Sequence, residues 1–236
     1  MKFFIRRKNK SSLIGSTLLM VSALSVSTLS AVAAEKPEMA DSVFTARYVF
    51  EKIKTSALEI LPPSTRLDML DYWDVDSIYK ASNVMDGLSW LENLTHDFLK
   101  VRISSVSTLE IKILPEKKGK LAMTVYTVGD DVQAQDSEIK FYDEYLNEVE
   151  TSKHIEMPRV KDFFEIPKGS ATKMKEIEEM IPFPTVAFTA NPQNDELEAR
   201  LTVEKYINQD DWNIAKLFVK PYVTLQWKKD KFKVEK

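Results

Sequence analysis

In the segment from Thr108 to Leu114, Leu109, Ile111 and Ile113 alternate with polar residues, and this pattern constrains the fold more than any other feature of the chain. Because successive side chains of a strand point to opposite faces, the pattern predicts a β-strand with one buried face. Similar runs follow after Gly119 and around Ile139, so we expect three antiparallel neighbours. We predict that they share one buried face, made of Leu109, Ile111, Ile113, Leu121, Met123, Val125, Ile139 and Phe141. Glu110 should then face solvent, and Glu110→Ala should be nearly neutral for stability.

Helices are predicted before these strands. Apolar residues recur at three- and four-residue spacing from Asp41 to Leu61, which predicts a helix capped by Asp41 and ended by Pro62-Pro63. Ser64 can cap a second, shorter helix that reaches Trp73.

Turn residues and periodicity predict the remaining elements. Asp86-Gly87 joins the segments 78–85 and 88–94 as a hairpin, because both turn residues tolerate positive φ. Helices are expected at 158–164, after Ser170 and from Asp210-Asp211 to Pro221, and strands at 186–190, 197–203, 222–227 and 232–234. The predicted fold class is α+β, with antiparallel meander sheets that are each covered on one face by short helices. We divide the chain after its leader into an N-terminal half, 35–150, and a C-terminal half, 151–236, packed together as one globular unit.

The first 34 residues are typical of an export signal. A basic cluster precedes an apolar, serine-rich run and the small-residue exit Ala31-Val32-Ala33-Ala34, so we predict cleavage after Ala33 or Ala34. An uncleaved anchor is the alternative, because about 20 apolar residues span a bilayer. After cleavage we expect no membrane span. The chain has no cysteine, which excludes a lipoprotein and disulfides, and we expect an exported protein that is periplasmic or secreted.

Charge argues against nucleic acid as a partner. The formal net charge is −3, and removal of residues 1–34, which carry five basic and no acidic side chains, makes it −8. A protein that binds phosphate backbones needs a basic surface.

The sequence contains no recognised catalytic motif, and it predicts no cofactor and no metal site. We interpret both histidines as surface or structural residues, with His96 at a junction between strands and His154 in a polar loop.

Acidic residues are the candidates for chemistry. A carboxylate pair could act as acid and base, or oxygen ligands could hold a hard cation. The candidates are Asp68, Asp71, Asp74, Asp76 and, farther along, Asp136. A structural role is the alternative that we favour, since carboxylates stabilise helix starts. In that role Asp71 should be held by Arg66, a nearby lysine or backbone amides.

Aromatic side chains could line a ligand-binding groove, although core packing is the alternative for half of them. They are Tyr72, Trp73, Tyr79 and Trp90. Two further tripeptides, at Ser42 and Ser77, match the Asp-Ser/Thr-apolar pattern that one group of Gram-negative gut bacteria O-glycosylates on exported proteins.

Several segments resemble one family of exported proteins. They are Arg66-Leu67-Asp68-Met69-Leu70-Asp71, Asn83-Val84-Met85-Asp86-Gly87, Ser107 to Pro115, and Asp136-Ser137 before Ile139-Lys140-Phe141-Tyr142. In these segments the chain is similar to the Bacteroidales family catalogued as domain of unknown function 3256. The resemblance implies a Gram-negative envelope protein and assigns no catalytic residue.

Two functions remain open from the sequence. The first is a non-enzymatic protein that binds an envelope protein, a glycan or an amphiphile through a sheet face or a helix-to-sheet groove. The second is a hydrolase that acts on glycans with two of the aspartates, because glycoside hydrolysis needs only two carboxylates. Two aspartates facing one open cleft would favour the enzyme, and scattered or paired aspartates would favour the binding protein.

Overall fold

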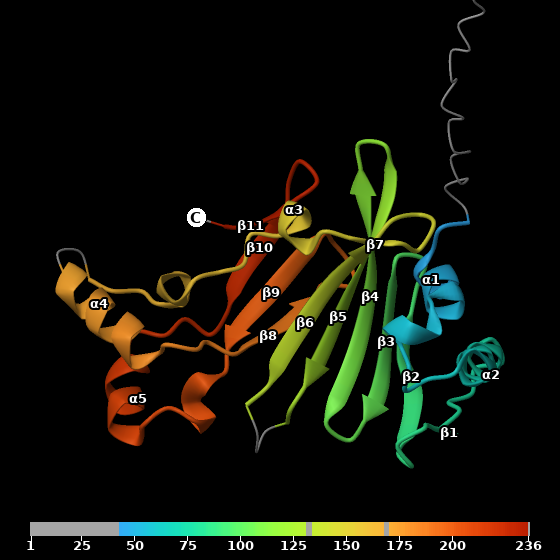
Figure 1. Cartoon of the computed structure of the whole chain (residues 1–236), viewed down its shortest axis with the longest axis horizontal. Coiled ribbons are helices and arrows are strands. Elements are labelled where there is room, and N and C mark those ends of the chain that lie inside the picture. The colour runs from blue at the N-terminus through green and yellow to red at the C-terminus, as the bar shows by residue number, and fades with distance from the viewer. Residues whose placement is uncertain (1–42, 131–133, 168–169, 236) are drawn as a thin grey trace, which may run out of the picture. The chain divides into compact units, whose positions relative to one another are not determined.

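The computed structural model describes residues 43–130, 134–167 and 170–235 (Figure 1). The first part of the chain forms α1 (Ala46–Lys52), the 3-10 helix η1 (Thr55–Ala57), α2 (Pro63–Trp73) and the strands β1 (Ala81–Ser82), β2 (Leu88–Leu94), β3 (Phe98–Ser104), β4 (Ser107–Glu116), β5 (Gly119–Val128), β6 (Asp136–Tyr142) and β7 (Glu148–Val149). The second part forms α3 (Thr151–His154), η2 (Val160–Phe163), α4 (Ala171–Met180), β8 (Val186–Ala190), β9 (Glu196–Leu201), η3 (Val203–Lys205), α5 (Gln209–Ala215), β10 (Val223–Trp227) and β11 (Phe232–Val234).

Two antiparallel sheets make up the fold. The first has seven strands in the order β1 to β7, and the second has four in the order β11-β10-β9-β8. Every named strand pair is antiparallel, as in a meander. The predicted α+β class with antiparallel sheets is therefore confirmed.

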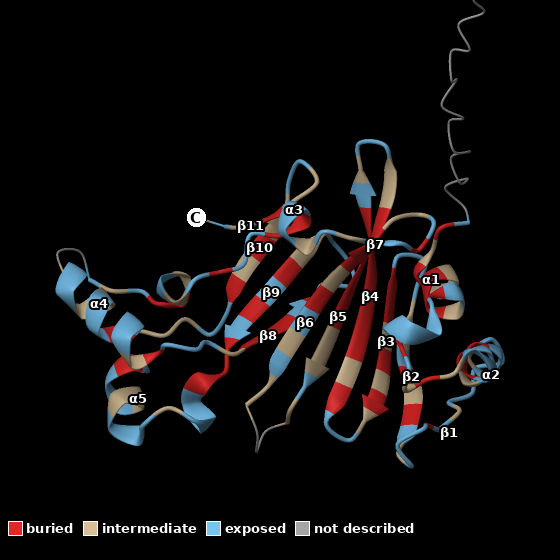
Figure 2. Cartoon of the chain, in the orientation of Figure 1, coloured by how far each residue is buried: buried red, intermediate tan, exposed pale blue. Residues whose placement is uncertain are grey.

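The register of β4 and β5 corrects the predicted buried face. Ile111 lies opposite Thr124, whereas Met123 lies opposite Lys112. Since directly opposed residues of an antiparallel pair share a face, Ile111 and Met123 point to opposite sides of the sheet. The prediction of one shared face was wrong by one residue of register, and both faces of these strands are buried (Figure 2).

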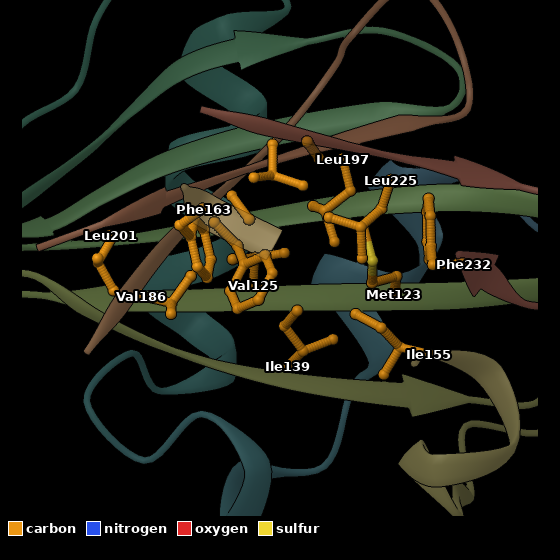
Figure 3. Close-up of a cluster of buried hydrophobic side chains, with 14 of the residues drawn as sticks. Met123, Val125, Ile139, Ile155, Phe163, Val186, Leu197, Leu201, Leu225 and Phe232 are labelled. Carbon is orange, nitrogen blue, oxygen red and sulfur yellow. The ribbon is translucent and has the colours of Figure 1, made fainter. Parts of the chain in front are cut away.

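Each face of the first sheet has its own hydrophobic core. The first face carries Leu109, Ile111 and Ile113 and packs with α1 and α2 around buried residues such as Phe50. The second face packs on the second sheet, and Figure 3 shows this cluster, which includes Met123, Val125, Ile139, Leu197, Leu225 and Phe232. Because the second sheet covers the second face, the charged residues Glu110 and Lys112 of β4 are buried as well.

The first two helices are shorter or start differently than predicted. The first begins at Ala46, and Thr45 caps it by accepting a hydrogen bond from the backbone N–H of Tyr48. Asp41, the predicted cap, lies outside the described residues. The second begins at Pro63, so Ser64 is an internal residue and not its cap. Proline suits this first helical position because the N–H that it lacks has no partner inside the helix.

The hairpin before β2 is confirmed, but its loop is longer than two residues. Ser82 lies opposite Leu88, and Asn83 closes the loop between them by accepting hydrogen bonds from the N–H groups of Met85 and Gly87. Asp86 has a φ of 57°, as a turn residue at this place requires.

The elements of the second half lie close to their predicted places. The strands β8, β9, β10 and β11 and the helices η2 and α4 are present within a few residues of the predicted bounds. The helix α5 begins as predicted but ends at Ala215, well before the predicted stop at Pro221. Asn208 rather than Asp210 caps α5, with its side chain accepting from the N–H groups of Asp210 and Asp211.

An edge strand of the second sheet meets the second face of the first sheet. The strand β8 contacts β6, β5 and β4, and its backbone N–H groups donate to side chains there. Val186 donates to Asp136 at 3.2 Å, Phe188 to Ser137 at 2.9 Å and Ala190 to Glu110 at 2.8 Å. Side chains of the first sheet therefore accept the hydrogen bonds that the backbone of a neighbouring strand would accept along this edge of β8.

Candidate ligand-binding groove

A groove of about 230 Å³ lies on the first face of the first sheet. Its floor is the part of β4, β5 and β6 that η1 and its flanking residues border, so the groove lies between a short helix and a sheet. The lining residues are Ile53, Ala57, Leu58, Glu59, Ile60, Leu109, Thr124, Tyr126, Glu138, Lys140 and Tyr142.

The groove has an apolar side and a polar side. The apolar surface is supplied by Ile53, Ala57, Leu58, Ile60 and Leu109, and Glu59 adds a carboxylate to this wall. The strands β5 and β6 supply the hydroxyl groups of Thr124, Tyr126 and Tyr142. A combination of apolar walls with a few polar groups is typical of small-molecule sites.

The strand period places the polar groups. Thr124 and Tyr126 are two residues apart on β5, and Glu138, Lys140 and Tyr142 follow the same spacing on β6. All five therefore share the first face. Lys140 Nζ lies 3.0 Å from Glu138 Oε1, so the charges at this side of the groove form an ion pair.

Burial perturbs one hydroxyl of the groove. Removal of Tyr142 from water raises its pKa to about 12, and the negative charges of Glu148 and Glu138 act in the same direction. Tyr142 is therefore a neutral hydroxyl at physiological pH, able to donate a hydrogen bond.

A buried arginine fixes the wall of the groove. The Nη1 of Arg66, on α2, donates to the carbonyl oxygens of Phe50 at 2.6 Å and Ile53 at 3.0 Å, at the end of α1. Arg66 is 1% exposed, and its burial lowers the pKa of its guanidinium. Because Ile53 lines the groove, the hydrogen bond from Arg66 to its carbonyl oxygen fixes the position of this part of the wall.

The aspartates predicted as catalytic candidates are scattered. Asp68, Asp71 and Asp76 are exposed, and Asp136 accepts from β8 in the contact between the sheets. Asp74 is bound by both terminal nitrogens of Arg47 at 2.7 Å, and this hydrogen bonding lowers the pKa of its carboxyl group. None of the five lines the groove.

The predicted partner of Asp71 was wrong. Arg66 donates to backbone carbonyls instead, and Asp71 forms no hydrogen bond or ion pair with another described residue. The paired carboxylate of this segment is Asp74, which lies three residues later at the end of α2. Among the described residues, no cluster of three or more His, Cys, Asp or Glu side chains could hold a metal ion.

The four aromatic candidates lie outside the groove. Tyr72 and Tyr79 stack on each other with ring centroids 4.6 Å apart, and Trp73 and Tyr79 pack against the core of the first face. Trp90 lies on β2, where Lys80 Nζ is 5.1 Å from the centre of its ring.

The histidines take structural places. His96 lies between β2 and β3, as predicted, with Nδ1 2.5 Å from Asp97 Oδ1. The prediction of a polar loop for His154 was wrong, because this residue ends α3 and is 8% exposed. Its ring packs beside those of Phe141 and Trp227, at centroid distances of 5.3 and 6.3 Å, and these two rings also contact each other.

Several sequence features concern other parts of the chain. The predicted cleavage residues Ala33 and Ala34 and the glycosylation candidate Ser42 lie outside the described residues, whereas Ser77 is exposed between α2 and β1. Within the described ranges, no helix combines the length and apolar character needed to cross a bilayer.

Sequence reasoning missed the groove because its polar residues belong to alternating strands. Thr124 and Tyr126 occupy the positions between the apolar residues of β5, where we expected a solvent-facing side. The available signal was their type, since threonine and tyrosine suit a partly buried strand face better than a fully solvated one.

Comparison with known proteins agrees with the resemblance found in the sequence. The chain matches the family model described as "Protein of unknown function (DUF3256)" over residues 41–232. No curated protein matches it. Among solved structures, a domain of an uncharacterized protein from Porphyromonas gingivalis is similar with a TM-score of 0.66 and 20% identity, covering 80% of this chain and 96% of that chain. The solved structure supports the fold, and the family match, which includes both sheets and the groove, shows that the chain belongs to the DUF3256 family.

Proposed function

We propose that this protein is an exported, non-enzymatic binding protein of the Gram-negative envelope, and that it holds part of an amphiphile in the helix-to-sheet groove. The observation that carries the proposal is the division of one groove into a mainly apolar side, formed by Ile53, Ala57, Leu58, Ile60 and Leu109, and a hydroxyl-bearing side. An amphiphile can bury its apolar part against the first and direct its polar part to the second.

The size of the groove limits the ligand. Sites for drug-sized molecules begin at roughly 300 Å³, and this groove measures about 230 Å³. The groove therefore suits one end of an amphiphile or a small apolar molecule. The ion pair of Glu138 and Lys140 offers a charge of either sign to the polar end.

The positions of the aspartates support binding over glycan hydrolysis. A glycosidase needs two carboxyl groups on either side of one bond, at most about 10 Å apart. Here Asp74 is engaged by Arg47, and Asp136 accepts from the backbone of β8. Neither carboxylate lines the groove.

The groove can be tested by filling it. Ala57 and Ser56 are adjacent, exposed residues of η1, but only Ala57 lines the groove. Ala57→Trp should block the groove without disturbing the core, and Ser56→Trp is the matched control. Isothermal titration calorimetry with dodecanoate below its micelle concentration measures binding, and dodecyl maltoside serves as the uncharged probe.

We expect the wild type and Ser56→Trp to bind at least one probe with equal affinity, and Ala57→Trp to bind it at least tenfold more weakly. The proposal fails if the wild type binds neither probe, or if Ala57→Trp binds as the wild type does. Export is tested separately by sequencing the N-terminus of the protein recovered from its native host, where we expect cleavage after Ala33 or Ala34.

A further inference from the structure

A second, polar cleft of about 250 Å³ lies on the opposite face of the first sheet. It forms where the outer face of β8 and β9 meets the part of β3, β4 and β5 that the second core leaves uncovered. Its lining residues are Lys100, Arg102, Thr108, Glu110, Thr127, Gln135, Ala187, Phe188, Thr189, Glu198, Arg200, Pro221 and Tyr222. Thr108 and Thr127 lie directly opposite each other in the register of β4 and β5. Each is next in sequence to a groove residue, Leu109 or Tyr126, so its side chain points to the opposite face of the sheet.

The cleft contains a cation without an acidic partner. Lys100 pairs with Glu110 at 3.0 Å, and Arg102 pairs with Glu92 at 2.9 Å. Arg200 is exposed and donates to the neutral amide oxygen of Gln135. It forms no ion pair with any described residue, in a chain whose net charge is negative. A guanidinium in this state is available for a carboxylate, which it can bind with two parallel hydrogen bonds.

The rest of the lining presents both donors and acceptors. The hydroxyl groups of Thr108, Thr127 and Thr189 can donate and accept, and the carboxylate of Glu198 can only accept. Tyr222 is 50% exposed and offers an aromatic surface beside them.

We propose that this cleft binds a sugar that carries a carboxylate group, such as a uronic acid unit of an acidic glycan. Arg200 receives the carboxylate, while Glu198 and the threonine hydroxyls bind the sugar hydroxyls. Glu198 accepts hydrogen bonds from the hydroxyl groups of a sugar, and ionised acidic side chains have no such hydroxyl groups. A neutral sugar can accept hydrogen bonds from Arg200 but has no charge to pair with it.

The same face continues toward an aromatic residue. Trp90 lies opposite Arg102 in the register of β2 and β3, so both side chains point to the second face. Trp90 is half-buried, and Lys80 lies over its ring. A chain of several sugar units bound at Arg200 has Trp90 available as an aromatic contact beyond the cleft.

Calorimetric titration of the full-length protein with trigalacturonate tests this site. Arg200→Gln removes the charge at an exposed position, and Lys175→Gln is the control, since Lys175 is 78% exposed on α4 and lies outside the cleft. We expect trigalacturonate to bind the wild type and Lys175→Gln equally, and Arg200→Gln at least tenfold more weakly. Binding should weaken as salt is added, because the contact is between charges near the surface.

Three further probes define the chemistry. Maltotriose, inorganic phosphate and triglutamate should each bind at least tenfold more weakly than trigalacturonate. The proposal is overturned if trigalacturonate does not bind, if Arg200→Gln binds it as the wild type does, or if phosphate or triglutamate binds equally well. Ala57→Trp, which fills the groove on the other face, should bind trigalacturonate normally. The proposal for the cleft and the proposal for the groove can therefore fail independently of each other.

Discussion

Glu110 provides the sharpest test of the contact between the two sheets. The residue is 4% exposed, and its carboxylate accepts from Ala190 N–H at 2.8 Å while it pairs with Lys100 Nζ at 3.0 Å. Alternation alone places Glu110 in solvent and makes Glu110→Ala nearly neutral. The structure reverses that prediction, because the second sheet covers this position.

The expected magnitude follows from what the substitution leaves behind. Glu110→Ala removes the acceptor of a buried N–H group, and an unsatisfied buried donor costs roughly 1 to 3 kcal/mol. Removing one partner of a buried ion pair costs roughly 3 to 5 kcal/mol. The side chain of Lys100 is 30% exposed and can turn toward water, which reduces the second cost. We therefore expect Glu110→Ala to lower the free energy of unfolding by about 3 kcal/mol.

Urea unfolding followed by tryptophan fluorescence measures the effect, with two comparison variants. Glu110→Gln retains an acceptor for Ala190 N–H and should cost only about 1 to 2 kcal/mol. Glu138→Ala removes a carboxylate of the same sheet that is 62% exposed, and it should change stability by less than about 0.5 kcal/mol. If Glu110→Ala and Glu138→Ala were equally mild, the reasoning about the buried contact would be refuted.

Three other outcomes are expected in the same unfolding assay. Ile111→Ala and Met123→Ala truncate the two different cores, so each should cost about 2 to 5 kcal/mol, and their costs should add to within about 0.5 kcal/mol; strong coupling between them would contradict the two-faced register. Arg66→Met should cost roughly 1 to 3 kcal/mol, because two buried carbonyls lose their donor while the relief of burying a cation offsets part of the loss. Burial raises the pKa of Tyr142 to about 12, so this hydroxyl ionises at lower pH in the unfolded chain than in the folded protein, and the wild type should lose stability between about pH 10 and pH 12. Tyr142→Phe should lack this part of the loss. Identical stability profiles for the two proteins would contradict the prediction.

The sequence predicted strands better than it predicted the faces that they bury. Alternation states which residues of one strand share a face, but only the pairing register connects that face to the next strand. The register was nevertheless available from the turn. Glu116 lies opposite Gly119, so Lys117 and Lys118 form a two-residue loop, and Gly119 has a φ of 122°. Counting back from such a loop pairs odd-numbered with even-numbered residues, which separates Ile111 from Met123.

The sequence suggested a helix-to-sheet groove but located neither the groove nor the cleft, because both depend on contacts between distant segments. The groove requires η1 to lie against β4, β5 and β6, and the sequence pattern predicted one continuous helix through that segment. Arg66 ends this helix early by binding the carbonyls of Phe50 and Ile53, and no local pattern announces a buried arginine of this kind. Local propensity thus identified the helix, while a tertiary contact determined where it stops.

The polar residues between the sheets also have a role that alternation conceals. An edge strand carries backbone N–H groups that need acceptors, and exposed edges invite pairing with strands of other chains. Here Asp136, Ser137 and Glu110 accept from alternate residues of β8, although donor and acceptor lie 50 to 80 residues apart in the sequence. The same side chains therefore fix the position of the second sheet and occupy the amide groups that another strand would use. Because Glu110 also lines the polar cleft, one buried carboxylate connects the packing of the sheets with the shape of the cleft.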